Sequence, residues 1–219
     1  MADYVAPSLT VPLQVYGSAD VNRLVHNDIH FAAYVGGTFL NEAARDAAIT
    51  SPTEGMHAYL TAPTVPTATG AITAIPLGVQ TIYNGSVWVC VTPVGSRSDT
   101  DATGSNSYVT TLTGDAVAIS VTLVTGTTAL VATHATASVD AVATNFLSFS
   151  VSGATTLSVT DDNGSRDVSE ASGRIVGVGR PLIITGLTAG TNTFTLNYKT
   201  DSISTITYYT RNIIVTGIA

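Results

Sequence analysis

The sequence predicts a mainly β protein, in which a small α+β amino-terminal module is followed by an antiparallel β-sandwich of the jelly-roll type. Charged residues make up only 11% of the 219 residues, and hydrophobic residues make up 45%. Thr, Ser, Gly, Val and Ala fill the difference, and this mixture favours strands and tight turns over helices. From residue 115 onward, short runs of alternating apolar and polar residues are separated by turn signals, which is typical of a sandwich.

Residues 1–29 are expected to form an arm and a short helix. Pro7 and Pro12 interrupt a β-prone segment that is either a strand or an arm over a neighbouring chain. Ser18 is a suitable N-cap for a helix over residues 19–30. The segment lacks the basic and apolar regions of a secretory signal, and no run in the chain approaches the roughly 18–20 apolar residues of a membrane span. We therefore expect a protein made in a cytoplasm, with no membrane partner.

Residues 30–94 are expected to form the α+β module. Asn41 is the predicted N-cap of its helix, and Asn84-Gly85 is the dipeptide that best tolerates a two-residue type I′ turn. Tyr83 and Trp88 are large enough to anchor a small core. The expected elements, in order, are a strand at 30–37, a helix at 41–49, a strand at 55–60 and a hairpin at 81–89.

Residues 95–113 form an abrupt stretch of small polar residues, which predicts a linker or a long exposed loop. Residues 114–219 are expected to form the sandwich, with about eight short strands. The run 193–199 alternates most cleanly, so its Phe, Leu and Tyr should face the core. The last run, 202–215, is mixed on both faces, which suits burial against a second chain or a central position in the sheet. The predicted turns are Thr125-Gly126, Ser152-Gly153, Asp162-Asn163-Gly164, Ala189-Gly190 and Thr200-Asp201.

Two groups of residues invite a metal-site hypothesis. His26 and His30 have the i, i+4 spacing at which two imidazoles can share a metal, but the residues between them lack the general base of an HExxH motif. Asp161, Asp162 and Asp167 surround a glycine as in a calcium loop, yet the closing glutamate of an EF-hand is absent. We favour capping, surface or contact roles for the histidines, and a polar hairpin turn for the aspartates.

The remaining candidate motifs favour a non-enzymatic protein without a cofactor. Cys90 lies in an apolar run and is better interpreted as a packed residue than as a reactive thiol. Asn84 and Asn163 match glycosylation sequons, but both are better explained as turns. The run 177–181 has two glycines without the rest of a dinucleotide fingerprint, and no P-loop, GxSxG or CxxC motif is present. With a net charge of −7 and no basic run, nucleic acid is not an expected partner.

The region from the predicted helix to the hairpin resembles a small module common in virion proteins of tailed bacteriophages, particularly those of actinobacteria. The pattern is a helix with an Arg-Asp-Ala core, a Pro-x-x-Gly-Met turn into a strand, and a pair of strands of the form Tyr-x-Gly-x-x-Trp. The insertion between Leu60 and Thr81 is longer than in that pattern. The matching residues are Arg45, Asp46, Pro52, Gly55, Met56, Tyr59, Tyr83, Gly85 and Trp88.

The carboxy-terminal part resembles the terminal β domains of phage fibre, minor tail and head-decoration proteins, on the runs FLSFSVSGATT, LIITGLTAGTNTFTLNYK and TYYTRNIIVTG. This resemblance implies a trimeric jelly roll of the tumour-necrosis-factor type and a location in the virion, assembled in the host cytoplasm. We expect a homotrimer that contacts other virion proteins, as a tail, fibre or collar component, or alternatively as a capsid decoration protein. A second alternative is a host-glycan-binding module, with Trp88, Tyr208 and Tyr209 as the stacking residues, although we favour packing roles for all three.

Overall fold

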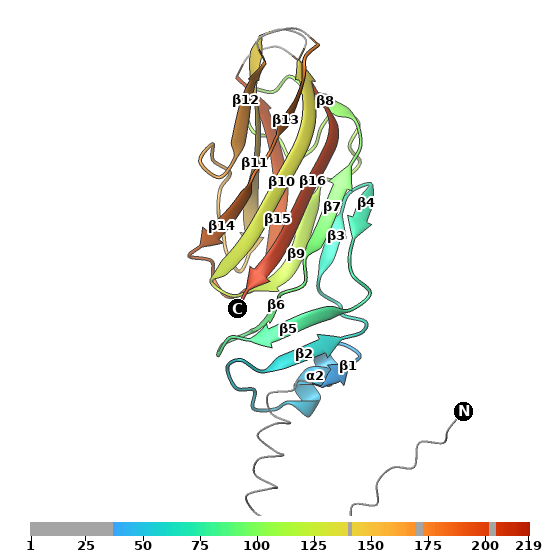
Figure 1. Ribbon diagram of the computed structural model, residues 1–219, viewed down its shortest axis with the longest axis vertical. Coiled ribbons are helices and arrows are strands. Elements are labelled where there is room, and N and C mark those ends of the chain that lie inside the picture. Colours follow the sequence, from blue (N-terminus) through green and yellow to red (C-terminus); the bar gives the residue numbers. More distant parts are fainter. Residues whose placement is uncertain (1–36, 140–141, 170–172, 202–204) are drawn as a thin grey trace, which may run out of the picture.

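Two antiparallel sheets pack face to face, and a smaller sheet with one helix lies at one end of them (Figure 1). This computed structural model describes residues 37–139, 142–169, 173–201 and 205–219. The arrangement confirms the predicted mainly β fold, with a small α+β module followed by an antiparallel sandwich. The predicted arm, the helix at 19–30 and nearly all of the strand at 30–37 lie outside the described residues.

The small sheet has the strand order β1-β2-β5-β6, in which β1 and β2 are parallel and the other pairs antiparallel. The helix of this module, α2 (Glu42–Ala48), begins where we expected, because the Asn41 side chain accepts a hydrogen bond of 3.0 Å from the Ala44 N–H. The strands of the module are β1 (Thr38–Phe39), β2 (His57–Leu60), β5 (Val79–Tyr83) and β6 (Trp88–Cys90).

The hairpin formed by β5 and β6 is confirmed, but its predicted two-residue turn is wrong. Tyr83 pairs with Trp88, so the connection has four residues. Gly85 takes a positive φ of 88°, whereas Asn84 does not adopt the positive φ that a type I′ turn requires. Instead the Asn84 side-chain oxygen accepts hydrogen bonds from the N–H groups of Ser86 and Val87. A side chain bonded to the backbone of its own loop therefore replaces the expected tight turn.

The five-stranded sheet has the order β12-β11-β15-β9-β3. The predicted alternation of β15 is confirmed, since Phe194, Leu196 and Tyr198 are all fully buried between the sheets. The predicted turns at Thr125-Gly126 and Ala189-Gly190 lie where β9 and β15 of this sheet connect to strands of the other large sheet. The strands are β3 (Thr67–Thr69), β9 (Ser120–Thr125), β11 (Ala143–Gly153), β12 (Ser165–Ser169) and β15 (Gly190–Thr200).

The seven-stranded sheet has the order β13-β10-β16-β7-β4, with β14 paired to β10 and β8 paired to β16. The final strand lies at the centre of this sheet, between β10 on one side and β7 and β8 on the other. The core accounts for the apolar residues on the inward side of β16, because Ile206, Tyr208, Ile213 and Val215 are fully buried. The strands are β4 (Ile72–Ala74), β7 (Val94–Ser98), β8 (Asp101–Thr103), β10 (Thr128–Val139), β13 (Ile175–Val178), β14 (Pro181–Thr185) and β16 (Ile206–Ile218).

The predicted linker or long loop at 95–113 is wrong for the first part of its length. Strands β7 and β8 lie within or overlap this stretch, and both pair with β16. Val94, Gly95 and Ser96 of β7 are buried even though the stretch is mostly small and polar. The polar composition of this stretch indicated a loop. Part of the stretch is nevertheless strand, because it pairs with β16, a central strand formed by residues far away along the chain.

The insertion between Leu60 and Thr81 also joins the sandwich, which the predicted boundary at residue 94 did not foresee. Strand β3 pairs with β9 at the edge of one sheet, and β4 pairs with β7 at the edge of the other. The sandwich therefore contains strands from well before residue 114. Since β3 and β4 form only short edge strands, their pattern in the sequence was too brief to predict them.

The module and the sandwich share one hydrophobic core. Leu60, Val79 and Cys90 of the module belong to the same buried cluster as the inward-facing residues of both large sheets. Glycine allows the close approach, because a Cβ atom at Gly217 of β16 would lie 2.6 Å from the carbonyl oxygen of Cys90. The two predicted units therefore form one continuous structure in the described residues (Figure 1).

Candidate functional site

Five of the nine residues of the virion-module pattern lie in one small cluster. Helix α2 presents Arg45, which is 5% exposed, so that its guanidinium carbon lies 4.7 Å from the ring centre of Trp88. The Trp88 ring contacts the Tyr83 ring with centroids 5.4 Å apart, and Met56 completes the cluster. Asp46 forms an ion pair of 2.9 Å with Arg45. The cation is thus held by one carboxylate and one aromatic face, which is a packing arrangement.

Glu42 ties this helix to the insertion. Its carboxylate accepts hydrogen bonds from the Thr64 N–H, the Thr64 hydroxyl and the Val65 N–H, at 2.9–3.0 Å. Partial burial acts to raise the pKa of Glu42, but these hydrogen bonds outweigh it, and the pKa lies below its ordinary value. The ionised form therefore anchors the start of the segment that leads up to β3.

A cavity of about 230 Å³ lies where the module meets the sandwich. Arg45, Trp88 and Cys90 line it from the module, and Val124 of β9 lines it from the sandwich. Cys90 is 2% exposed, as expected of a packed residue, and burial raises the pKa of its thiol. A thiol that stays protonated and enclosed is a poor nucleophile, so this cavity offers no activated group from Cys90.

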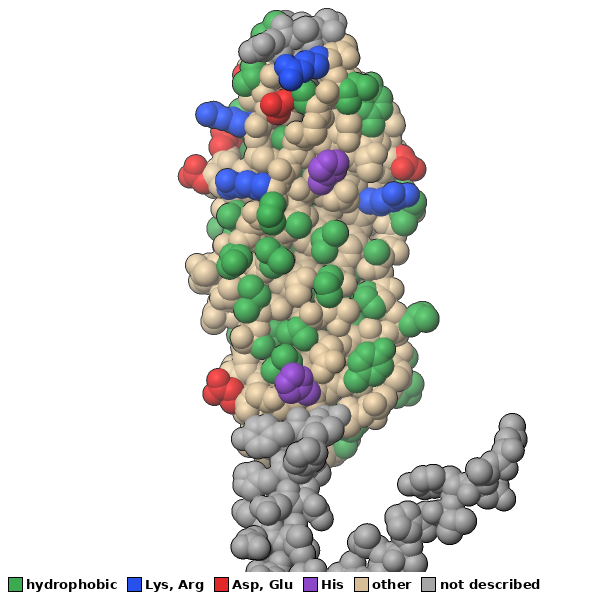
Figure 2. Space-filling model, viewed as in Figure 1, with side chains coloured by type: hydrophobic (Ala, Val, Ile, Leu, Met, Phe, Trp, Pro, Cys, Tyr) green, Lys and Arg blue, Asp and Glu red, His purple; other side chains and the backbone are tan. Residues whose placement is uncertain are grey.

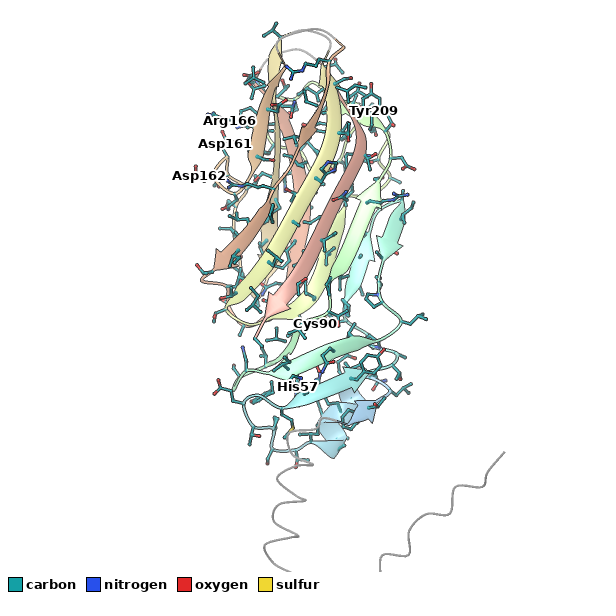
Figure 3. The ribbon with its side chains drawn as sticks, in the orientation of Figure 1. His57, Cys90, Asp161, Asp162, Arg166 and Tyr209 are labelled. Atoms are coloured by element: carbon teal, nitrogen blue, oxygen red, sulfur yellow. The ribbon has the colours of Figure 1, made fainter. Side chains whose placement is uncertain are left out.

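The Asp161 turn lies on the side of the sandwich, with Arg166 beside it (Figure 3). Asp161 accepts hydrogen bonds from the Tyr108 hydroxyl at 2.9 Å and from Lys199 Nζ at 2.5 Å. The Lys199 ammonium also lies over the rings of Tyr108 and Phe146, at 4.6 and 4.4 Å. Asp161 is therefore already engaged by protein groups.

The other carboxylates of the calcium-loop hypothesis do not converge on Asp161. Asp162 contributes its backbone carbonyl, which accepts a hydrogen bond from Arg180, and Asp167 lies on β12. Within the described ranges, no three His, Cys, Asp or Glu side chains are placed to hold a metal ion together. The Gly164 N–H donates to the Asp161 carbonyl, so these residues form a β-turn at the end of the connection between β11 and β12.

The two histidines that the structure describes lie on different sheets. His57 is exposed on β2 and lies 3.1 Å from the Gln80 side-chain nitrogen, and His134 is exposed on β10 (Figures 2 and 3). His26 and His30 fall outside the described residues, so neither the metal-site hypothesis nor the favoured capping, surface or contact roles are tested. The run 177–181 bridges β13 and β14, where Gly179 packs against the backbone of β10.

The three aromatic residues weighed for glycan stacking have different environments. Trp88 is 8% exposed within the Arg45 cluster, and Tyr208 is fully buried with its hydroxyl donating to the Phe146 carbonyl at 3.0 Å. These two therefore have packing roles. Tyr209 is 37% exposed, and its hydroxyl lies 3.0 Å from the Ser138 hydroxyl (Figure 3). A glycan surface would have to rely on this single ring among the three.

Arg211 and Asp115 form a buried ion pair that the sequence did not predict. Arg211 of β16 is 1% exposed and binds both carboxylate oxygens of Asp115, at 2.5 and 2.8 Å, and it donates two further hydrogen bonds to the Asp99 carbonyl. A lone arginine inside an apolar strand was the available signal, because a buried charge requires a partner. The identity of that partner depended on chain segments far apart in sequence.

A second unpredicted feature is a group of buried polar atoms at the end of the sandwich away from the module. Both side-chain polar atoms of Asn145 lack a hydrogen-bond partner, as do Ser165 Oγ and Asp167 Oδ2. Asn145 pairs in register with Asp167 across β11 and β12, so these groups face the same inter-sheet space. Such atoms usually bind ordered water or cost stability.

No protein-family model and no curated protein matches this sequence. Among solved structures, one match is the CBM22-1–GH10 part of the endo-1,4-β-D-xylanase 10B of Clostridium thermocellum, complexed with xylohexaose. The sequences are 11% identical, the TM-score is 0.30, and the match covers 55% of this chain and 26% of that chain. A similarity of this size carries no argument about function. The helix that the structure describes is too short to cross a bilayer.

Proposed function

We propose that this chain is a non-enzymatic structural component of a tailed-phage virion, acting as a minor protein of the tail, fibre or collar. The observation that carries the proposal is the cluster of Arg45, Met56, Tyr83 and Trp88, which are residues of the virion-module pattern. Residues spread along the pattern pack against one another, so the pattern corresponds to a folded unit.

The remaining structure suits a protein that works by stability and assembly. One continuous core joins the module to both large sheets, and the buried Arg211–Asp115 pair fixes the central strand. A rigid body of this kind can transmit an attachment at the module end to the far end of the sandwich. Such a role needs no catalytic group, and it is consistent with Asp161 being bonded to Tyr108 and Lys199 and with Cys90 being buried.

The proposed assembly is a homotrimer held mainly by the sandwich, residues 114–219, together with the strands that earlier residues add to it. Because β3, β4, β7 and β8 all lie before residue 114, the full chain is the appropriate sample. In sedimentation equilibrium, a trimer would have three times the 22.4 kDa mass of one chain. A single-chain mass at micromolar concentration would contradict the trimer.

The location is tested on phage particles from cells that produce the chain. Gradient-purified particles should contain the chain, and quantitative mass spectrometry with immunogold imaging should find a small number of copies at one vertex or along the tail. Hundreds of copies spread over the shell would overturn the tail assignment in favour of capsid decoration. Complete absence from the particles would overturn the virion proposal.

A further inference from the structure

The inner face of the five-stranded sheet changes from apolar to polar at the end away from the module. On β11, the alternate residues Asn145, Leu147, Phe149 and Val151 point between the sheets, and each is at most 2% exposed. Three of these are the apolar side chains expected in a core. Asn145 is the exception, and it is fully buried at a position where each of its polar atoms needs a partner.

Strand register places two further polar residues on the same side of the sheet. Asp167 of β12 lies directly opposite Asn145, and Ser165 comes two residues earlier on the same strand. Directly opposite residues have Cβ atoms about 4.5–5.5 Å apart, and alternate residues of one strand are about 6.8 Å apart. The three side chains are therefore neighbours that extend into one space.

Four atoms of this group have no hydrogen-bond partner among the described residues. They are Oδ1 and Nδ2 of Asn145, Oγ of Ser165 and Oδ2 of Asp167. Asn145 and Asp167 face each other, yet their polar atoms do not bond directly. An ion coordinated at about 2.4 Å can hold two opposite oxygen ligands up to about 4.8 Å apart, which is too far for a direct hydrogen bond.

The group carries a negative charge that the described part of the protein does not neutralise. None of the ion pairs among the described residues includes Asp167. Strand β13 of the other sheet contacts β12, and its inward residues Val176 and Val178 are apolar. Because a buried carboxylate oxygen is costly without a compensating charge, the partner that this group calls for is a cation.

The available oxygen atoms are those that a calcium ion prefers. A carboxylate, an amide carbonyl and a hydroxyl are hard ligands, and Ca²⁺ takes about six to eight of these in a flexible geometry, with waters completing its shell. Mg²⁺ demands a near-ideal octahedron and gives up water reluctantly, and Zn²⁺ favours histidine and cysteine. The Asn145 amide nitrogen, which cannot bind a cation, can donate to a coordinated water.

A polar hollow at the side of the sandwich reaches the edge of this group. Its volume is about 500 Å³, and Ser165 lines it together with Asp161, Asp162, Arg166 and Arg180. Figure 3 shows Asp161, Asp162 and Arg166 near one another there. Since Ser165 belongs to both the hollow and the polar group, the hollow provides a path for an ion and for the waters that it keeps.

We propose that Asn145, Ser165 and Asp167 form a calcium site between the two sheets, which fastens β11 to β12 where the core becomes polar. The site differs from the calcium-loop hypothesis, because Asp161 and Asp162 stand outside it. With a single carboxylate it should bind weakly, in the range of about 10⁻⁴–10⁻³ M that extracellular calcium modules show. The inference does not depend on the proposed virion role.

Calorimetric titration of the full, metal-free chain with CaCl₂ tests the site. One Ca²⁺ should bind per chain, and Asp167→Asn should weaken binding by roughly tenfold or more, because it removes the charge and keeps the shape. Asp161→Asn is the matched control, since Asp161 lines the hollow without belonging to the site, and it should change the dissociation constant by less than about twofold. Circular dichroism should confirm that both variants fold.

Thermal unfolding provides a second measurement. Calcium at about 10 mM should raise the melting temperature of the wild type and of Asp161→Asn, and should leave Asp167→Asn unchanged. In calcium-free buffer Asn145→Leu should be more stable than the wild type, because it removes two unpartnered atoms, and calcium should reduce that difference.

Two results would overturn the site. A wild-type chain that neither binds calcium nor gains stability at about 10 mM would leave ordered water as the partner of these atoms. Calcium binding that is lost in Asp161→Asn but kept in Asp167→Asn would place the ion in the turn at Asp161 instead.

Discussion

Replacing Asp115 by Asn should destabilise the protein strongly, because it leaves the Arg211 guanidinium buried without a negative partner. The side chains of this pair are 5% and 1% exposed, and two of the four Arg211 hydrogen bonds go to the Asp115 carboxylate. Removing one partner of a buried pair typically costs about 3–5 kcal/mol. We expect Asp115→Asn to lower the free energy of unfolding by that amount at pH 7, measured by chemical denaturation.

The double variant Asp115→Leu with Arg211→Met tests whether the cost comes from the orphaned charge. Replacing both partners by apolar residues removes the desolvation penalty together with the attraction, so the double variant should lose at least about 2 kcal/mol less than the sum of the single losses. Asp161→Asn is the matched control, since Asp161 pairs with Lys199 with its side chain half exposed, and it should cost about 0–1 kcal/mol.

The pH dependence follows from the same pair. Burial acts to raise the pKa of Asp115, but the hydrogen bonds from Arg211 and from the Leu112 N–H outweigh it, so the pKa lies below its ordinary value. A lowered pKa in the folded state gives stability that is present above the ordinary value of about 3.9 and is lost as pH falls through the lowered pKa. The difference between wild type and Asp115→Asn should therefore be constant near neutral pH and shrink in acid. A cost below about 1 kcal/mol at pH 7, or singles that simply add, would refute this reasoning.

Three further outcomes are expected. Asn145→Leu should raise the free energy of unfolding by about 1–3 kcal/mol because it removes two buried unpaired polar atoms, and a loss of stability would mean that bound water satisfies them. Gly217→Ala should lower thermal stability by about 1–3 kcal/mol through its clash with the Cys90 carbonyl, whereas the control Gly177→Ala, whose nearest neighbour would be 3.9 Å away, should have little effect. Cys90 should react with a disulfide reagent at pH 7 roughly 100-fold more slowly in the native than in the unfolded chain, and equal rates would contradict its burial.

Local patterns predicted those parts of the fold that depend on neighbours in sequence. The alternation around Phe194, Leu196 and Tyr198 placed them in the core, and Asn41 started its helix, because periodicity and capping act over a few residues. The turns at Thr125-Gly126 and Ala189-Gly190 were found for the same reason. The four-residue turn after Tyr83 was missed because the Asn84 side chain bonds to its own loop, an alternative that the dipeptide alone does not distinguish.

The sequence by itself determined that this protein is mainly β, that its second half is a sandwich, and that its aromatic residues mostly pack, because low charge and period-two alternation leave few other ways to bury apolar side chains. Only the tertiary structure decided that β7 and β8 are strands and that Arg211 meets Asp115. Each of these depends on contacts between residues far apart in the chain. Such contacts are fixed by how the sheets assemble, and no local pattern encodes that assembly.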